Sequence, residues 1–332
     1  MRLLLLRTWL TNIGNGFIDM GAKASLERAY PDAEIVTASG FGAYTGYHRR
    51  LGIFSGIQGL SDQVADLAER RRTPRKHDAL NISNLVDCDV AVLPGCTLYP
   101  GALEPYRETL RDLSDRGIPI VLLGAGGMDY SPETRRYVRD VLEEVGIEGM
   151  ITRDIRALEA YDGLVHEARD GIDCAFFIDD YYTPPRADRE FDVHLFDKIN
   201  EPRIGSPRTV VRPDHSPFGY AKPYKGLVKQ AWSTLTDTGP QDNEFRSDVI
   251  EDYLFLYANA TETHADRIHA CVPALVYGNR ARFYYETPRA LLFEQFHDLD
   301  TRSNLVELSD KQLQERKRTQ VADIQAVVDS VR

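Results

Sequence analysis

Short apolar runs alternate with amphipathic segments along the first half of the chain. The runs at residues 3–6, 34–38, 89–93, 118–123, 149–152 and 172–178 predict strands, and most are apolar at consecutive positions. Consecutive apolar positions are typical of strands that are buried on both faces of a parallel sheet. Segments with helical periodicity lie between them, at 17–30, 103–116, 132–145 and 155–161. This alternation predicts an α/β domain of the Rossmann type.

A polar break separates this unit from a second one. Residues 181–189 read YYTPPRADR, and paired prolines with clustered charge are typical of a linker. Beyond it we expect strands at 208–211 and 281–285, helices at 249–258 and 290–296, and a charged terminal helix at 311–331. Since 332 residues exceed what one hydrophobic core usually spans, we expect two Rossmann-like domains, residues 1–182 and 190–332.

Composition narrows the classes of partner and compartment. A net charge of −11 argues against general binding to nucleic acid or to anionic membranes, and leaves room for a local basic pocket. Only 8 of the 40 basic residues are Lys, which fits either a salt-adapted (halophilic) cytoplasm or a genomic bias toward Arg codons. No apolar run is long enough to span a membrane, and the N-terminal run is too short for a signal peptide. We expect a cytoplasmic protein, with peripheral membrane contact and homo-oligomerisation left open.

Four cysteines are scattered without a CxxC pair, which fits buried thiols in a reducing compartment, at Cys88, Cys96, Cys174 and Cys271. Ligand clusters with zinc-type spacing are not found, so no metal is expected. The GxSxG and HExxH motifs of serine and zinc hydrolases are missing.

The stretch at 258–278 carries the strongest candidate chemistry. Arg267 and His269 lie two residues apart where an apolar helix is expected at 270–277, with Pro273 in its first turn and Gly278 as its stop. A helix start offers free N–H groups and partial positive charge, so a guanidinium and an imidazole there predict an anion site with a proton donor. The alternative is structural, an interdomain salt bridge beside a hydrogen-bonded core histidine.

Other candidates follow the predicted strands. Glycine-bearing loops at 14–16, 95–97 and 124–127 lie where parallel sheets collect ligands, although none matches a dinucleotide or P-loop pattern. Arg153 follows a strand and precedes a helix that Asp154 can cap, so it either pairs with a carboxylate on a neighbouring loop or binds ligand. His264 is expected on the loop before His269. The remaining candidate histidines lie in polar surroundings and are expected to be exposed: His194, His215 and His297.

Several of these motifs occur together in a fixed order. They are NIG at 12–14, VLPG at 92–95, LLGAG at 122–126, TRD at 152–154, GIDCAF at 171–176 and DRIHA at 266–270, followed by ALVYG at 274–278. In this order the chain resembles the polysaccharide pyruvyl transferase family over residues 10–295. The Arg-x-His-Ala and Arg-Asp elements carry most of the resemblance.

The resemblance implies a fold and a reaction. It implies two Rossmann-like domains facing across a cleft in a GT-B-like arrangement, with no metal or nucleotide cofactor. The reaction moves the pyruvyl group of phosphoenolpyruvate onto sugar hydroxyls of a glycan or glycolipid precursor, commonly as a ketal. Phosphate and carboxylate groups call for Arg, which pairs with both in a planar, bidentate way.

The resemblance also assigns roles to residues. His269 is the candidate general acid that protonates the methylene carbon of the donor, because a histidine titrates near neutral pH. Arg267 and Arg153 would hold the donor beside it. The remaining expected substrate-binding positions are Asn12, Gly14, Asn15, Asp19, Gly95, Gly126 and Arg289.

Two positions depart from the family pattern. Asn15 stands where an Asp is common and cannot act as a base, although Asp19 lies one helical turn further on. Arg289 stands where Lys is common, which keeps the charge and changes its geometry. Two alternatives therefore stay open. One is a GT-B glycosyltransferase whose Glu262 or Asp266 holds the ribose of a nucleotide sugar, and the other is a non-catalytic relative that binds sugars or anions.

Overall fold

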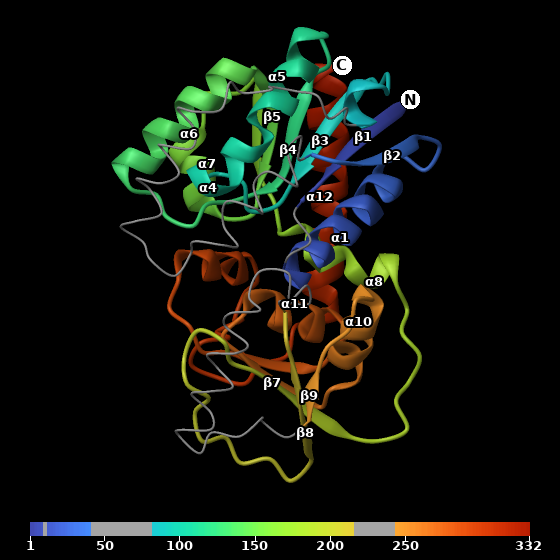
Figure 1. Cartoon of the computed structure of the whole chain (residues 1–332), viewed down its shortest axis with the longest axis vertical. Coiled ribbons are helices and arrows are strands. Elements are labelled where there is room, and N and C mark those ends of the chain that lie inside the picture. The colour runs from blue at the N-terminus through green and yellow to red at the C-terminus, as the bar shows by residue number, and fades with distance from the viewer. Residues whose placement is uncertain (9–11, 41–81, 216–242) are drawn as a thin grey trace, which may run out of the picture.

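The computed structural model describes residues 1–8, 12–40, 82–215 and 243–332, which form two parallel sheets with helices around them (Figure 1). The first sheet has the strand order β2-β1-β3-β4-β5-β6. Its strands are β1 Arg2–Arg7, β2 Glu34–Ser39, β3 Val90–Pro94, β4 Ile120–Ala125, β5 Ile147–Thr152 and β6 Glu167–Asp170. The second sheet has the order β11-β10-β7-β8-β9. Its strands are β7 Phe191–Leu195, β8 Thr209–Pro213, β9 Glu244–Phe245, β10 Glu262–Ala265 and β11 Arg280–Phe283.

Helices lie between most consecutive strands, as is usual for parallel sheets, although the described connection from β7 to β8 is a loop. The α-helices are α1 Ile13–Ala29, α4 Pro100–Leu103, α5 Arg107–Asp115, α6 Pro132–Val145, α7 Ile155–Tyr161, α8 Ile178–Tyr181, α10 Ile250–Asn259, α11 Ile268–Val276 and α12 Asp310–Val331. Short 3-10 turns complete them, η1 Ile82–Asn84, η2 Glu104–Tyr106, η3 Cys174–Phe177 and η5 Pro288–Gln295.

The four inner strands of the first sheet, β1, β3, β4 and β5, are buried on both faces, as their apolar runs predict. Along β1, Leu3 and Leu5 belong to one apolar core and Leu4 and Leu6 to another, because successive side chains point to opposite faces. The core on the Leu4 side packs under α5 and α6. The core on the Leu3 side takes in α1, α11 and α12 and continues into β7 of the second sheet. The two halves of the chain therefore share one hydrophobic core.

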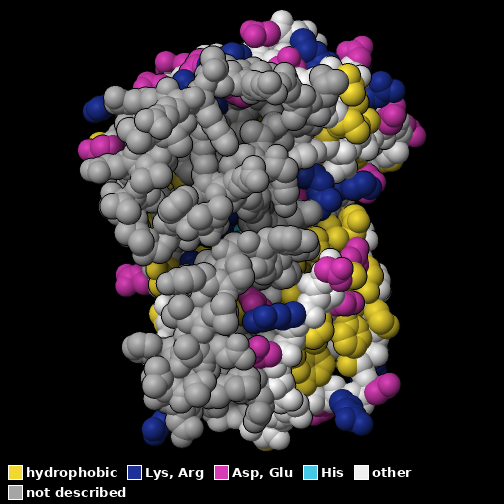
Figure 2. Space-filling view, in the orientation of Figure 1, with side chains coloured by type: hydrophobic (Ala, Val, Ile, Leu, Met, Phe, Trp, Pro, Cys, Tyr) yellow, Lys and Arg dark blue, Asp and Glu magenta, His cyan; other side chains and the backbone are white. Residues whose placement is uncertain are grey.

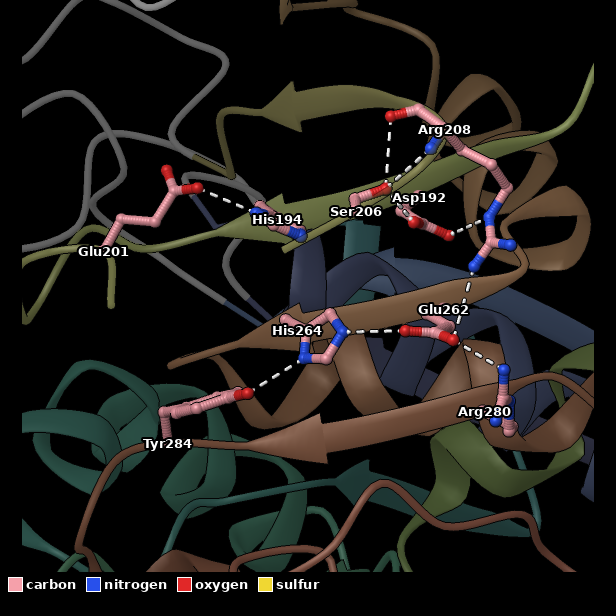
Figure 3. A network of polar contacts seen from close by, with 9 residues as sticks. All are labelled: Asp192, His194, Glu201, Ser206, Arg208, Glu262, His264, Arg280 and Tyr284. Atoms are coloured by element: carbon pink, nitrogen blue, oxygen red, sulfur yellow. Dashed lines mark hydrogen bonds and ion pairs between the residues drawn. The ribbon is translucent and has the colours of Figure 1, made fainter. Parts of the chain in front are cut away.

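The second sheet differs because one of its faces is polar. Phe191, Val193 and Leu195 of β7 join the shared core, whereas Asp192 and His194 alternate with them and point away. On that face the side chains form a network of ion pairs and hydrogen bonds (Figure 3). This polar face explains why β7 and β10, with their charged and histidine residues, are not predicted from apolar runs.

The C-terminal helix α12 returns to the first half of the molecule. It runs alongside the first sheet, and the C terminus lies at the same end as the N terminus (Figure 1). The Tyr30 hydroxyl donates to Asp329 Oδ1 at 2.8 Å, which ties α12 to the end of α1. Further along α12, the fully buried Lys317 pairs with Asp179 and Asp180 of α8. This helix thus belongs to the second half in sequence and packs on the first sheet.

One expected strand is wrong. The apolar run 172–178 forms a loop and the 3-10 turn η3, and the sheet's sixth strand is the more polar β6 just before it. Asp173 caps η3 by accepting a hydrogen bond from the Ala175 amide at 2.9 Å. A short apolar run is equally compatible with a buried turn of helix and with a strand, so its pattern alone does not decide.

Surface charge and hydropathy are consistent with the composition. Lys and Arg side chains are interspersed with Asp and Glu over the described part of the face in Figure 2. Among the described residues, no helix combines the length and the apolar character needed to cross a bilayer. All four cysteines are free, and Cys96 is half-buried where burial was expected, whereas the other three are buried.

Candidate functional site

Three element ends from distant parts of the sequence meet between the two sheets. They are the start of α1, the turn η3 after β6, and the start of α11. Asn12 caps α1 by accepting a hydrogen bond from the Gly14 amide at 3.2 Å. Gly14 lies against His269 so closely that a Cβ atom at Gly14 would be 2.7 Å from His269 Cβ. A glycine is therefore required for α1 to approach this histidine.

A buried chain of polar side chains runs from the first half of the molecule to the second. Arg153 Nη1 donates to Asp173 Oδ2 at 2.6 Å, and His269 Nε2 lies 3.3 Å from the same oxygen. All three side chains are buried, and Arg153 and Asp173 are 0% exposed. Arg153 thus has the carboxylate partner on a neighbouring loop that its structural interpretation predicts, and this partner also contacts His269.

Burial and charge set the protonation of this chain. Burial opposes ionisation of Asp173, but the neighbouring His269 and Arg153 outweigh it and hold the pKa of Asp173 well below its ordinary value. For His269, burial lowers the pKa, and the adjacent carboxylate of Asp173 only partly restores it. These contacts favour the ionised form of Asp173, and burial disfavours the protonated form of His269.

The local sequence explains how α11 presents its first turn. Arg267 is the extended residue before the helix, and His269 follows inside the first turn with φ −80° and ψ 19°. Gly278 ends the helix with φ +80°, a backbone conformation that favours glycine. The helix begins two residues earlier than predicted, so both Arg267 and His269 lie at its start as the sequence indicated, and Pro273 lies in its interior.

A pocket beside His269 gathers three cations. Arg267, Arg289 and Lys198 line it together with Asn12 and His269. Burial lowers the pKa of Lys198, and the nearby charges of Arg267 and Arg289 lower it further. Mutual repulsion of this kind indicates that the three side chains lie close together. Three cations around one pocket favour an anion with more than one negative charge, although its volume of about 10 Å³ holds little more than one water molecule.

The cations differ in how far they are already paired. Arg267 Nε lies 2.8 Å from both carboxylate oxygens of Asp197, so Arg267 forms a salt bridge, but within the second half of the chain and not between the two predicted domains. Arg289 Nε is buried without a hydrogen-bond partner, and its charge contributes to the lowered pKa of His269. Arg153 Nε and Nη2 are also buried and unpaired. Of these two residues only Arg289 lines the pocket, so its unpaired Nε is the group that an incoming anion would meet.

The candidates near the end of β1 form a separate group. Thr8 donates to Asp19 Oδ1 from its amide at 2.9 Å and from its hydroxyl at 2.8 Å, and Arg7 Nε reaches Oδ2 at 3.3 Å. Burial raises the pKa of Asp19 to about 6. Gly95, at φ +88°, lies over α1 beside Ile18. The structure does not bring Asp19 or Gly95 into the pocket lining beside His269.

The remaining predicted positions have structural contacts. Asn15 donates its amide to the Asn12 carbonyl at 2.9 Å and is half-buried in the first turn of α1. A Cβ atom at Gly126 would lie 2.5 Å from Arg153 Nε, so this glycine makes room for the buried guanidinium. Asp154 caps α7 through the Ala157 amide at 2.9 Å, as predicted.

The expectations for the other histidines are mostly wrong. His194 and His215 are buried rather than exposed, and His264 is buried on β10 rather than on a loop, whereas His297 is exposed as expected. His194 and His264 belong to the polar face of the second sheet, where Glu201 and Tyr284 accept or donate at 2.7 and 2.9 Å (Figure 3). Polar neighbours in the sequence therefore do not predict exposure. On a strand whose alternate residues form such a network, polar side chains are buried.

Three residues of the site are assigned no function from the sequence. Asp173 lies inside a motif quoted above but has no assigned chemistry there. Lys198 lies in the loop after β7, and His215 lies after β8 with Nε2 2.5 Å from the Tyr257 hydroxyl. Both line the pocket. Neither belongs to a motif, and only the parallel pairing of β7 with β8 and β10 brings them to this edge.

Comparisons with known proteins concern the fold. No protein-family model matches the chain, and no curated protein sequence matches it. A structure of a putative UDP-N-acetylglucosamine 2-epimerase from Listeria monocytogenes is 12% identical with a TM-score of 0.50, over 100% of this chain and 90% of its own. The corresponding epimerase from Neisseria meningitidis, bound to UDP-GlcNAc, is 10% identical with a TM-score of 0.49, over 100% and 94%.

A HepE protein of Anabaena in complex with UDP-glucose is 13% identical with a TM-score of 0.40, over 99% of this chain and 95% of its own. At such identities the likeness concerns architecture alone. The chain thus has two parallel α/β sheets in a GT-B-like fold, as predicted.

Proposed function

We propose that the protein is a pyruvyltransferase that uses phosphoenolpyruvate and a sugar acceptor. The observation that carries this proposal is that separate motif segments converge on one place. Four of the ordered motifs each contribute one residue. Arg153 and His269 both contact Asp173, and Gly14 lies against His269.

The pocket's charges match the donor. Phosphoenolpyruvate carries a phosphate and a carboxylate, and Lys198, Arg267 and Arg289 supply three cations to one small pocket. The unpaired Nε of Arg289 is available for a charge-assisted hydrogen bond, whereas Arg267 would have to share its guanidinium with Asp197. We therefore assign Arg289 and Lys198 as the first donor contacts.

The His269–Asp173 pair is suited to donate a proton, because the negative charge of a bound substrate would favour protonation of His269. Negative charge beside an imidazole favours the protonated form, so a bound donor would raise the pKa of His269 from its lowered resting value. Asp173 holds the imidazole through Nε2 and stabilises the resulting positive charge. His269 would then give its proton to the methylene carbon of the donor and make the adjacent carbon electrophilic.

The test begins with binding and then with turnover. Isothermal titration should detect phosphoenolpyruvate binding to the full chain, and phosphate should be released when a panel of aryl hexosides and lipid-linked hexoses is added. His269→Ala should abolish phosphate release while the donor still binds. If neither binding nor phosphate release is found, the proposal is wrong, and binding without turnover on any acceptor would favour a non-catalytic anion-binding relative.

A nucleotide-sugar transferase remains the second candidate because of the GT-B-like fold. Of its two proposed ribose ligands, Glu262 pairs with Arg280 on the polar face of the second sheet, away from the pocket lining. Only Asp266 lines the pocket. A thermal-shift screen against UDP- and GDP-sugars tests this candidate, and stabilisation by a nucleotide sugar but not by phosphoenolpyruvate would support it.

A further inference from the structure

The proposed reaction requires a group that accepts the proton of the attacking sugar hydroxyl. Asn15 cannot be that base because an amide does not take up a proton near neutral pH. Asp19 is ionisable, but Thr8 and Arg7 already occupy both of its carboxylate oxygens. The base is therefore not among the substrate-binding positions that the resemblance assigned.

Asp266 has the required geometry. It follows β10 directly and is buried, with 1% of its surface exposed. One oxygen, Oδ2, accepts hydrogen bonds from the consecutive amides of Asp197, Lys198 and Ile199 at 2.9, 2.7 and 3.0 Å. The other oxygen, Oδ1, is buried and has no hydrogen-bond partner.

The free oxygen belongs to a residue of the donor pocket. The Asp266 side chain lines the same pocket as His269 and Arg289. Three amide donors on Oδ2 fix the carboxylate plane, so Oδ1 has a defined direction and an unused lone pair. An unpaired buried carboxylate oxygen is unfavourable in a folded protein unless a ligand supplies the missing donor. A sugar hydroxyl is such a donor.

We propose that Asp266 is the general base of the acceptor subsite, an inference that rests on the proposed function. The three amides favour the ionised form, and burial, which is the largest effect, raises the pKa of Asp266. A raised pKa makes the carboxylate a better base than an exposed aspartate.

The proton and bond changes balance as follows. His269 gives a proton to the methylene carbon, and the hydroxyl oxygen bonds to the neighbouring carbon while its proton moves to Asp266 Oδ1. The bond to the phosphate oxygen then breaks with its electron pair leaving on phosphate. A second hydroxyl bonds to the same carbon and closes the ketal, and its proton leaves with phosphate. The proton on Asp266 returns through solvent to His269.

The matched substitution is Asp266→Asn in the full-length chain. Its carbonyl oxygen still accepts the three amides, while an NH2 group replaces the free oxygen and removes the base. Asp115→Asn, at an exposed position, controls for the loss of one charge. We expect Asp266→Asn to keep phosphoenolpyruvate affinity within about threefold and to lower kcat by roughly 100-fold or more, with the acidic limb of the pH–rate profile lost.

A second variant separates catalysis from loop positioning. Asp266→Ser offers a hydroxyl to the amides but no base, and should show the same pattern. Turnover within about threefold of wild type in either folded variant would overturn the inference, and so would loss of donor binding in both, since Asp266 would then only hold the 197–199 loop. If the wild-type protein itself releases no phosphate, the proposed function has failed rather than this assignment.

Discussion

Arg289 is the residue through which the donor proposal is most directly tested. Its Nε is buried and unpaired at the start of η5, and its charge acts on His269. We expect Arg289→Ala to weaken phosphoenolpyruvate binding by roughly 10- to 150-fold, since a hydrogen bond to a charged group contributes about 1.5–3 kcal/mol. The affinity of Arg289→Lys should lie between those of the wild type and Arg289→Ala, because Lys keeps the charge and loses the planar guanidinium. Isothermal titration measures both.

The control for this prediction is Arg302→Ala, which removes an exposed guanidinium outside the cationic pocket. It should leave donor affinity unchanged. Equal weakening in Arg302→Ala and Arg289→Ala would point to a general charge effect of the protein surface, and Arg289 would lose its assignment as a donor contact.

Asp19 predicts a pH-dependent stability effect. Burial raises its pKa from 3.8 to about 6, so its contribution to stability is fully present below pH 3.8 and is lost as pH rises through 6. The Asp19→Asn variant cannot ionise, so it does not lose this stability at high pH, and its amide oxygen still accepts from Thr8. We expect the variant to gain up to about 3 kcal/mol at pH 8, from 2.2 pKa units at about 1.36 kcal/mol each, and little at pH 4.

Urea denaturation of both proteins at pH 4 and pH 8 measures the free energies of unfolding. Asp115→Asn, at an exposed position, should show no such pH-dependent gain. A gain for Asp19→Asn that is the same at both pH values would contradict the raised pKa as its cause.

At the residue scale, the sequence identifies site residues only where chemistry and motif coincide. Arg153 and His269 are candidates because a cation and an imidazole stand inside recognisable motifs, and the structure places both against Asp173. Asp173 is harder to identify from the sequence, because an aspartate before an apolar run resembles an ordinary helix cap. It also acts as a cap, for η3. Lys198 and His215 are brought to the pocket by strand pairing alone, and no local pattern reports that.

At the level of elements, the close approach of α1 to η3 holds Asp173 in place. A Cβ atom at Gly21 of α1 would lie 1.9 Å from the Cys174 carbonyl oxygen, which is backbone. Gly21→Ala must therefore push α1 away from the turn that carries Asp173. We expect a loss of about 1–3 kcal/mol in the free energy of unfolding, which is typical of overpacking, and a lower kcat in the folded fraction.

Gly205→Ala is the matched control, because a Cβ atom there would meet nothing within 4 Å. Urea denaturation and phosphate release measure both effects. Equal stability of the two variants would show that α1 and η3 tolerate separation, contrary to the packing seen here.

The elements that the sequence predicts well are those with apolar faces on both sides or a clear helical period. The helix at 132–145 is found with its exact bounds, since Ser131 caps it and Gly146 ends it at φ +63°. The polar strands β7 and β10 are missed because the alternation of their apolar residues runs over only four or five positions. Their polar residues are stabilised by partners distant in sequence, which no local pattern contains.

For the whole molecule, the shared core predicts how the chain unfolds. One apolar cluster contains β1, α1, α11 and β7, and α12 returns from the second half to pack on the first sheet. The buried Lys317 binds α12 to α8 through two carboxylates, and removing one partner of a buried ion pair typically destabilises by about 3–5 kcal/mol. Neither half can therefore lose its packing without exposing the core of the other.

We therefore expect one cooperative thermal transition in calorimetry, with equal calorimetric and van't Hoff enthalpies, although the chain has two sheets. Lys317→Ala should lower the transition temperature of the whole molecule without splitting the peak, because the apolar cluster still joins the halves. Lys311→Ala, near the start of α12 and exposed, is the control. Two separate transitions in the wild-type protein would mean that the shared core does not couple the halves.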